Sequence, residues 1–253
     1  MGFDVAAEAY ARFMGRYSEP LAVSFLEVAG LEPGQRALDV GCGPGALTAR
    51  LVDLLGPDHV AAIDPSESFV SAARERFPAV DVRLGYAEEL PFAADAFDAA
   101  LAELVVHFMS DPVAGLREMA RVTRPGGVVA ACVWDMSSDA NPLATFWAAV
   151  RESDPAALDE SGLPGVREGD LVALATAAGL VGVSPSQLWV GTRYESFDEW
   201  WEPYTLGVGP AGGHVAGLAE EERRALRERC ARRLGDGPFD VVARAWCVRG
   251  SVT

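Results

Sequence analysis

Lysine is absent from this sequence of 253 residues, and all 21 basic residues are arginines. Without lysine the chain cannot form a Schiff base or use a lysine as general base. It also cannot form a P-loop, in which a lysine contacts the bound phosphates. We attribute the absence to a biased genomic composition, so it excludes classes of function without indicating one.

Histidine and cysteine are also scarce, with three and four residues. The cysteines are too dispersed for a zinc site, and nothing in the sequence suggests export. No apolar run reaches the roughly 18–20 residues that span a bilayer, and the opening residues 1–4 do not resemble a signal peptide. We therefore expect a cytoplasmic protein that uses no metal. The scarce residues are His59, His107, His214, Cys42, Cys132, Cys230 and Cys247.

A dense basic surface is missing as well, because the formal net charge is −16. Nucleic acid and anionic membranes both require clustered positive charge, so we expect neither as a partner. Six arginines do gather between residues 223 and 233, in a helical pattern that begins at Glu220. Acidic residues at its start, arginines at its end and the i,i+4 pairs Glu220–Arg224 and Glu228–Arg232 predict a solvated helix that ends before Gly235.

From residue 36 onward, short β-type runs alternate with helical runs. This alternation predicts a Rossmann-like, doubly wound α/β fold with helices on both faces of a mostly parallel sheet. We expect a single overall domain with an N-terminal helical cap (1–35), a core (36–135) and the remainder of the sheet (136–253), which carries an aromatic insertion at about 197–236. The predicted strands are 36–40, 60–63, 80–84, 97–106, 128–134, 186–194 and 240–248, and the predicted helices before the arginine-rich one are 46–55, 67–77, 112–122, 141–152 and 168–178.

The turn between the first predicted strand and the first predicted helix of the core is rich in glycine. Such a turn lets the backbone approach a ligand closely. Gly41, Gly43 and Ala46 satisfy the loose G-x-G-x-x-G/A dinucleotide pattern. Asp64 ends the second predicted strand, where an acid can bind ribose hydroxyls. These residues predict a nucleoside ligand and leave open which one.

Three segments, which follow one another along the chain, narrow the choice of nucleoside ligand. The turn reads Asp39-Val-Gly-Cys-Gly-Pro-Gly, and NAD and FAD proteins normally place an apolar residue where Asp39 stands. The segments 85–98 and 116–127 follow it. Together they resemble class I S-adenosylmethionine (SAM)-dependent methyltransferases over about residues 36–135. The resemblance is greatest to the small-molecule group that includes quinone-biosynthesis enzymes, and the head segment 10–18 is similar to that group too.

The resemblance implies a seven-stranded sheet with an antiparallel C-terminal strand, and SAM as the cofactor. Backbone at the three glycines would pass beneath the methionyl and ribose portions, Asp64 would bind the ribose, and Arg16 is the candidate partner of the SAM carboxylate. Tyr86 departs from the family, which usually has an Asp there to bind the adenine. The implied cofactor-binding residues are Arg16, Asp39, Gly41, Gly43, Gly45, Asp64, Pro65, Ala87, Glu88, Glu103 and Leu104.

The implied reaction moves a methyl group to an O, N or C nucleophile of a small molecule. Alignment of the two reactants supplies most of the rate, so a catalytic residue is optional, and we assign none. His107 is the first candidate base, although it also fits a packed histidine. The aromatic residues Trp147, Trp200, Trp201 and Tyr204 lead us to expect an aromatic or polyketide-like acceptor, although they would equally pack the insertion onto the sheet.

Two other classes of function stay open. A NAD(P)-dependent oxidoreductase shares the glycine turn and Asp64, but the Tyr-x-x-x-Lys pair of many reductases is ruled out by the missing lysine. A non-catalytic SAM-binding regulatory protein is the other alternative, because methyl transfer requires no signature residue. A homodimer is likewise left open.

Overall fold

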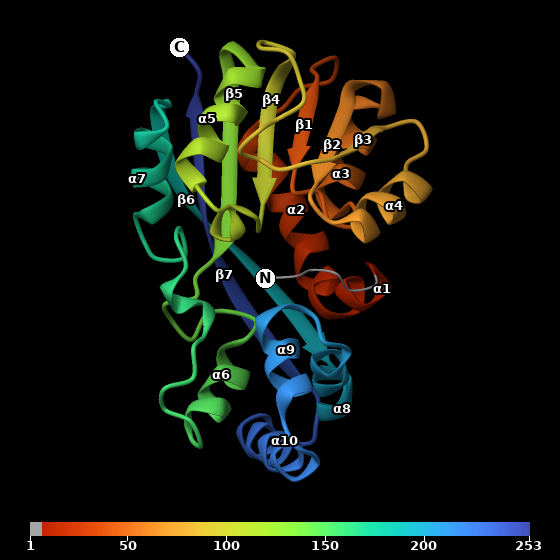
Figure 1. Ribbon diagram of the computed structural model, residues 1–253, viewed down its shortest axis with the longest axis vertical. Helices are drawn as coiled ribbons and strands as arrows, with labels where there is room; N and C mark the ends of the chain where they lie inside the picture. The colour runs from red at the N-terminus through yellow and green to blue at the C-terminus, as the bar shows by residue number, and fades with distance from the viewer. Residues whose placement is uncertain (1–6) are drawn as a thin grey trace.

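The computed structural model describes residues 7–253 and contains a seven-stranded sheet (Figure 1). The strand order is β3-β2-β1-β4-β5-β7-β6, and β7 runs antiparallel to both of its neighbours. This arrangement confirms the expected Rossmann-like fold with its antiparallel C-terminal strand. The strands are β1 Ala37–Val40, β2 Val60–Asp64, β3 Asp81–Leu84, β4 Phe97–Glu103, β5 Thr123–Trp134, β6 Val181–Tyr194 and β7 Phe239–Ser251.

Helices cover both faces of this sheet, because its inner strands are apolar on both sides. In β1, Ala37 packs into the core beneath α2 and α3, whereas Leu38 packs into the core beneath α5 and α7. A π-helical turn, Ala11–Gly15, joins α1 to α2. The helices are α1 Ala7–Tyr10, α2 Arg16–Ala29, α3 Ala46–Leu55, α4 Glu67–Arg76, α5 Pro112–Val122, α6 Ala144–Arg151, α7 Asp170–Ala177, α8 Phe197–Trp201, α9 Gly209–Gly217 and α10 Glu220–Leu234.

Most predicted elements are found within two residues of their expected ends, and the larger departures lie in β4, β5, β6, β7 and α6. β4 ends at Glu103 rather than at residue 106, because Leu104 adopts a left-handed conformation with φ 60°. A short 3-10 turn, Val106–Phe108, then carries His107. β5 and β6 begin earlier than expected, at Thr123 and Val181, because pairing with neighbouring strands extends both of them. The early end of β4 is the departure that shapes the site.

A second group of helices, α6 and α8–α10, lies beyond the sheet at the far end of the long β6–β7 ribbon (Figure 1). We call it the cap. Its centre is aromatic: the ring of Tyr204 stacks on Phe146 with centroids 4.7 Å apart and lies 4.7 Å from Trp200. The predicted insertion at about 197–236 therefore forms most of the cap, and α6 completes it.

The arginine-rich helix α10 is packed against other parts of the cap rather than fully solvated. Leu226 and Cys230, four residues apart, are buried. Arginines on the flanks of this buried stripe bind other elements: Arg233 pairs with Glu152 at 2.7 Å and Arg229 donates to the Ala149 carbonyl at 3.0 Å. Within the helix, the ion pair found is i,i+3, Arg223–Glu220, instead of the expected i,i+4 pairs.

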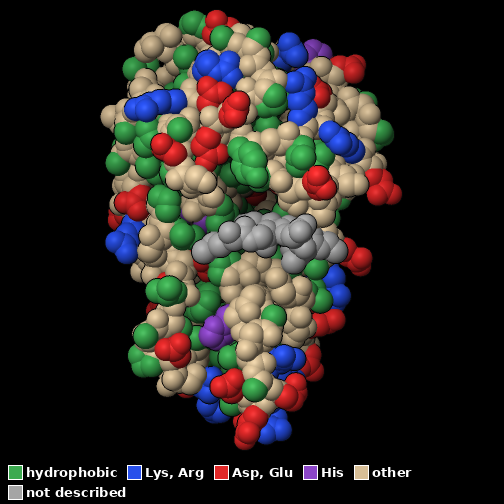
Figure 2. Space-filling model, viewed as in Figure 1, with side chains coloured by type: hydrophobic (Ala, Val, Ile, Leu, Met, Phe, Trp, Pro, Cys, Tyr) green, Lys and Arg blue, Asp and Glu red, His purple; other side chains and the backbone are tan. Residues whose placement is uncertain are grey.

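Charged side chains are spread over the face of the molecule shown in Figure 2. Arginines there are interspersed with Asp and Glu and form no continuous basic stripe. Across residues 7–253, none of the helices combines the length and the apolar character needed to cross a membrane.

Replacing Leu226 with Ala should lower the free energy of unfolding by about 2–5 kcal/mol, because the change leaves a cavity in a fully buried position. The exposed neighbour Arg224→Ala should change it by no more than about 0.5 kcal/mol. Urea denaturation of the two variants measures both values. Equal, small effects would mean that α10 does not pack against the rest of the cap as described.

Candidate functional site

The glycine turn between β1 and α3 needs glycine for two reasons. Gly41, Gly43 and Gly45 have φ angles of 73°, 53° and 93°, which L side chains rarely adopt. A Cβ atom at Gly41 would also lie 2.3 Å from Val105 Cγ2, and one at Gly45 would lie 2.4 Å from Phe77 Cε2. The turn is therefore held close to the residues that follow β4 and α4.

The backbone N–H groups of this turn are already used within the chain. A turn that binds pyrophosphate leaves such groups free to point at the anion. Here Pro44 has no N–H, and the other four donate internally. Gly41 and Cys42 donate to the Ile63 carbonyl at 2.8 and 3.0 Å, Gly43 donates to Asp64 Oδ2 at 2.9 Å, and Gly45 donates to the Cys42 carbonyl at 2.9 Å.

Asp64 ends β2 and stabilises the turn from the side. Its Oδ2 accepts from the Gly43 N–H, and its Oδ1 accepts from the Ser66 N–H at 2.9 Å. Burial raises the pKa of Asp64, against the effect of these two hydrogen bonds. Each carboxylate oxygen keeps a further lone pair, so the group can still accept from ligand hydroxyls.

Asp39, on β1, is almost completely buried at 1% exposure. Its Oδ2 accepts a hydrogen bond of 2.6 Å from the Thr48 hydroxyl on α3. Burial raises its pKa from the ordinary 3.8 to about 7, and the negative charge of Asp64 adds to the rise. The carboxylate form of Asp39 is thus held at an energetic cost in the ligand-free protein.

Glu103, the last residue of β4, has the least satisfied carboxyl group of the site. Both of its oxygens are buried and have no hydrogen-bond partner within the described chain. Burial raises its pKa well above the ordinary value, and Asp39 and Glu19 raise it further. An unpaired buried carboxyl is costly. A cationic ligand beside it would remove that cost.

Tyr10 joins the glycine turn to the pocket beside it. A Cβ at Gly43 would lie 4.0 Å from Tyr10 Cε1, and the Tyr10 ring packs edge-on against Phe69 with centroids 5.1 Å apart. Burial raises the pKa of Tyr10, as do the nearby Glu103 and Asp64. The sequence interpretation did not include Tyr10 among the site residues, although it lies in the head segment that resembles the family.

The remaining predicted residues lie around the same edge of the sheet with different surroundings. Leu104 and Ala87 are buried, whereas Pro65 is exposed. Glu88 Oε1 accepts from the Ser110 and Asp111 N–H groups at 2.7 and 3.2 Å. Glu88 is therefore tied to the start of α5 through one oxygen, which leaves its other oxygen for a ligand. Tyr86, which stands where the family usually has an Asp, is 66% exposed.

Arg16 differs from the other predicted residues in its partners. Its Nη2 binds Glu199 of the cap at 2.6 Å, and its guanidinium lies 4.5 Å from the centroid of the Tyr194 ring. Its Nη1 is buried without a partner in the described chain. The contacts of Arg16 thus join α2 to the cap, and they do not include the glycine turn.

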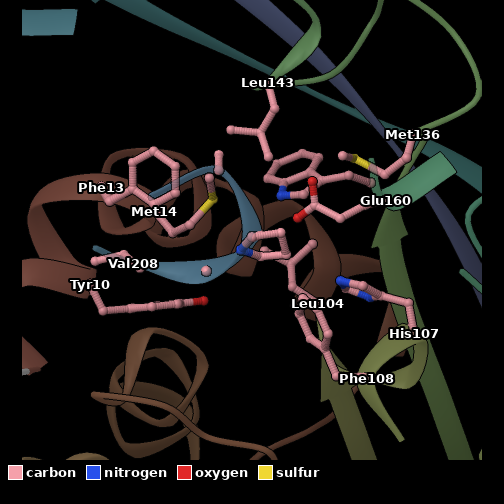
Figure 3. A pocket seen from close by; sticks show the side chains of 14 residues that line it. Tyr10, Phe13, Met14, Leu104, His107, Phe108, Met136, Leu143, Glu160 and Val208 are labelled. Carbon is pink, nitrogen blue, oxygen red and sulfur yellow. The ribbon is translucent and has the colours of Figure 1, made fainter. Parts of the chain in front are cut away.

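A pocket of about 520 Å³, counting the part open to solvent, lies next to Leu104 between the sheet and the cap (Figure 3). Its walls are mainly apolar. The polar groups are the Tyr10 hydroxyl, the His107 ring, the Trp134 indole and the Glu160 carboxyl. The lining residues are Tyr10, Phe13, Met14, Leu104, His107, Phe108, Trp134, Met136, Leu143, Glu160, Val208, Gly209, Pro210 and Ala211.

The four aromatic residues expected at the acceptor do not line this pocket. Trp147, Trp200, Trp201 and Tyr204 are 2–6% exposed and pack inside the cap. They hold the cap together, and Trp147 contacts the pocket only through its bond to Glu160. The structure thus gives them a packing role, as in the alternative that they pack the insertion onto the sheet, but their ring contacts lie within the cap.

His107, the first candidate base, has an environment that opposes that role. Burial lowers its pKa to about 3, because no anionic group compensates the buried imidazolium. Its Nδ1 is buried and has no partner within residues 7–253. His107 is therefore neutral near pH 7 and is a weak base, although its ring still lies in the pocket wall.

Glu160 is another residue of the pocket that the sequence interpretation missed. Its Oε2 accepts from Trp147 Nε1 at 2.9 Å, and burial raises its pKa to about 7. It lies in a turn between α6 and α7, within a segment rich in Pro, Gly and acidic residues. That segment has no periodicity or motif, so nothing local marks one carboxylate among its neighbours.

Comparison with known proteins agrees with this geometry. Residues 38–131 match the family described as a methyltransferase domain. The resemblance to class I methyltransferases is confirmed. The matched part runs from β1 into β5 and contains the glycine turn, Asp64 and Glu103.

Curated relatives align with the same part of the chain. Malonyl-acyl-carrier-protein O-methyltransferase of Serratia marcescens is 36% identical over 129 residues, which cover 49% of this chain and 50% of that protein. Demethylmenaquinone methyltransferase of Beutenbergia cavernae is 42% identical over 102 residues, which cover 40% of this chain and 42% of that protein. The chain thus spans about half or less of the length of these relatives.

Solved structures extend the likeness of the methyltransferase domain to the whole fold. Geranyl diphosphate C-methyltransferase of Streptomyces coelicolor, solved with Mg²⁺, geranyl diphosphate and S-adenosylhomocysteine, has a TM-score of 0.54 at 14% identity, covering 94% of this chain and 80% of that one. The 4+2 cyclase SpnF has a TM-score of 0.58 at 21% identity, covering 93% and 82%. At these identities the likeness shows the fold alone.

Gly41→Ala should abolish cofactor binding, because its Cβ would collide with Val105 as well as strain the backbone. Gly34→Ala is the matched control: it has φ 93° and open space around it, so it should cost about 1–2 kcal/mol of stability and leave binding unchanged. Calorimetric titration with SAM and urea denaturation measure the two effects. Normal binding by Gly41→Ala would show that the close approach to Val105 is not required.

The contribution of Asp39 to the stability of the ligand-free protein should fall as the pH rises from about 4 to above 7. Over this range Asp39 keeps its proton in the folded chain, with a pKa of about 7, and loses it in the unfolded chain near the ordinary 3.8, so folding binds a proton. Asp39→Asn keeps an acceptor for Thr48 and should flatten the slope. The exposed Asp58→Asn should not. Urea denaturation across this pH range measures the slopes, and equal slopes for all three proteins would contradict the assignment.

Proposed function

We propose that this chain transfers a methyl group from SAM to an O, N or C nucleophile of a small molecule. The observation that carries the proposal is the buried carboxyl of Glu103, which has no partner in the described chain and lies near Asp39 beside the glycine turn. SAM carries a sulfonium and an ammonium group, and such a cation would satisfy this carboxyl. The confirmed match to a methyltransferase domain supports the same conclusion.

The same charges argue against a dinucleotide, the ligand of the alternative NAD(P)-dependent oxidoreductase. A pyrophosphate is anionic, and three buried carboxyl groups (Asp39, Asp64 and Glu103) surround the turn where it would bind. The turn N–H groups that would bind its oxygens already donate to Ile63, Cys42 and Asp64. Electrostatics and hydrogen bonding therefore both favour a cationic nucleoside.

The cofactor residues expected from the sequence fit this proposal to different degrees. Asp64 keeps acceptor capacity for ribose hydroxyls, and Glu88 keeps one free oxygen for the adenine edge, with Ala87 and Pro65 beside it. Leu104 lines the acceptor pocket and adjoins Glu103, so the methionine end of SAM would lie between the two. Arg16 would have to exchange Glu199 for the SAM carboxylate.

When bound, SAM supplies a methyl group on a sulfonium centre that leaves as a thioether. The residues of this chain have to align the acceptor with that methyl group and exclude water. Alignment alone contributes about 7–11 kcal/mol in favourable cases. The apolar pocket between Leu104 and the cap provides the space for this step. An uncharged small molecule fits its lining.

The second candidate is a protein that binds SAM without transferring its methyl group. The similarity of the fold to a 4+2 cyclase supports this candidate, because the named activity of that protein is a cyclisation and not a methyl transfer. Turnover of labelled SAM with small-molecule acceptors separates the two. Independence from metals, a cytoplasmic location, the absence of nucleic-acid partners and a homodimer are further predictions of the sequence that stay open to experiment.

Calorimetry should show that the protein binds SAM and does not bind NAD(H). Glu103→Gln should weaken SAM binding by about 30-fold or more, because the variant loses a buried charge that faces the cation. The exposed Glu89→Gln on the adjacent segment is the matched control and should bind SAM normally. Binding of NAD(H) without SAM, or unchanged affinity of Glu103→Gln, would overturn the proposal.

A further inference from the structure

Glu160 forms part of the acceptor pocket although it belongs to neither the glycine turn nor the sheet. It begins a short turn, Glu160–Gly162, between α6 and α7. Its side chain lies in the pocket wall across from Leu104 and His107 (Figure 3). The residue is 6% exposed, so its carboxyl is shielded from bulk water. A carboxyl in this position faces whatever molecule the pocket holds.

Trp147 fixes this carboxyl through one oxygen. The Trp147 indole Nε1 donates to Glu160 Oε2 at 2.9 Å. The indole itself is buried in the cap, packed edge-on against Phe146 with ring centroids 5.1 Å apart. Glu160 Oε1 accepts no hydrogen bond from residues 7–253, so it is the oxygen left for a ligand. Trp147 is a positioning residue for Glu160.

The other polar groups of the pocket indicate which kind of molecule it can bind. The Trp134 Nε1–H and the His107 Nδ1 are buried and have no partner in the described chain. No arginine is among the described residues that line the pocket. An anionic acceptor would meet Glu160 without a compensating cation, and a cationic acceptor would be repelled by the sulfonium. The occupant that fits is neutral, mainly apolar and carries a hydroxyl group that can donate to Glu160.

We propose that Glu160 is the general base for this pocket and that the acceptor is a neutral molecule with a phenolic or enolic hydroxyl. This inference rests on the proposed function. The acceptor oxygen forms a bond to the methyl carbon while the carbon–sulfur bond breaks and its electron pair stays on sulfur. The proton of the hydroxyl passes to Glu160 Oε1, so the products are the methyl ether, a thioether and a neutral carboxyl.

The acidity of the groups favours a phenol over an aliphatic alcohol. Burial raises the pKa of Glu160 to about 7, and Asp159 adds to the rise. The pKa of the base is then within about three units of the pKa of a phenol such as the tyrosine side chain. The other groups around Glu160 that titrate or carry charge include Arg151, which pairs with Asp159, Arg167, which donates to the Ser161 carbonyl, and His107, Tyr10, Tyr204 and, beyond Trp147, His214.

The first test uses binding of 4-nitrophenol, whose phenol is colourless and whose phenolate is yellow. Above neutral pH the SAM-free protein should bind the phenol form, because ionised Glu160 accepts a hydrogen bond from the phenol hydroxyl and repels the phenolate, so the colour fades on binding. Glu160→Gln keeps a hydrogen-bond partner for Trp147 and should bind the yellow form. Equal colour changes for the two proteins, or no binding to the unsubstituted protein, would overturn the inference.

The second test uses methyl transfer to catechols and other phenols from labelled SAM. For a phenol that is turned over, kcat should rise with pH through an inflection near 7, because the carboxylate form of Glu160 is the active one. Glu160→Gln should lower kcat by about 100-fold or more and remove the inflection, with KM for SAM little changed. Trp147→Phe should lower kcat less and move the inflection.

Controls separate this inference from the proposed function. The exposed Glu168→Gln lies in the same connection between α6 and α7 and should behave as the unsubstituted protein in both tests. Failure of the unsubstituted protein to bind SAM in the calorimeter contradicts the proposed function itself. Normal SAM binding and turnover with full activity in Glu160→Gln contradicts the role of Glu160 alone.

Discussion

Burial of negative charge at the carboxyl ends of the central strands is the constraint on which this site depends. Asp39 and Asp64 obtain hydrogen bonds from within the chain, from the Thr48 hydroxyl and the Gly43 N–H. Glu103 obtains none, so burial favours its neutral form unless a cation from outside the described chain lies beside it. The N–H groups of the glycine turn donate to Ile63, Cys42 and Asp64, so they are not free to bind a phosphate as those of a glycine turn otherwise can.

The early end of β4 links this charged edge to the acceptor pocket. Leu104 leaves the strand in a left-handed conformation directly after Glu103, and the turn that follows carries His107 into the pocket wall. The opposite wall comes from Glu160 and from residues near the start of α9, which the aromatic core of the cap holds in place. The cofactor edge and the acceptor pocket thus share one boundary, at Leu104.

Patterns local to the sequence predicted the core well. The limits of α3 follow from a glycine turn on one side and Gly56 on the other, and β2 is a short apolar run that ends in Asp64. Glu103 could be predicted because a charged residue interrupts an apolar strand. The arginine-rich helix was misjudged, because its sparse buried stripe of Leu226 and Cys230 is hidden among charged residues that bind other elements.

The sequence by itself determined the fold class, the glycine turn and the acids at the strand ends, because each depends on residues adjacent in the chain or on strand order. Tertiary structure decided the pocket beside Leu104. Glu160 lies more than fifty residues from Leu104 in the chain and reaches it only because the cap folds back over the sheet. Its proton affinity comes from burial, which is a property of the packed structure, and so does the low basicity of His107.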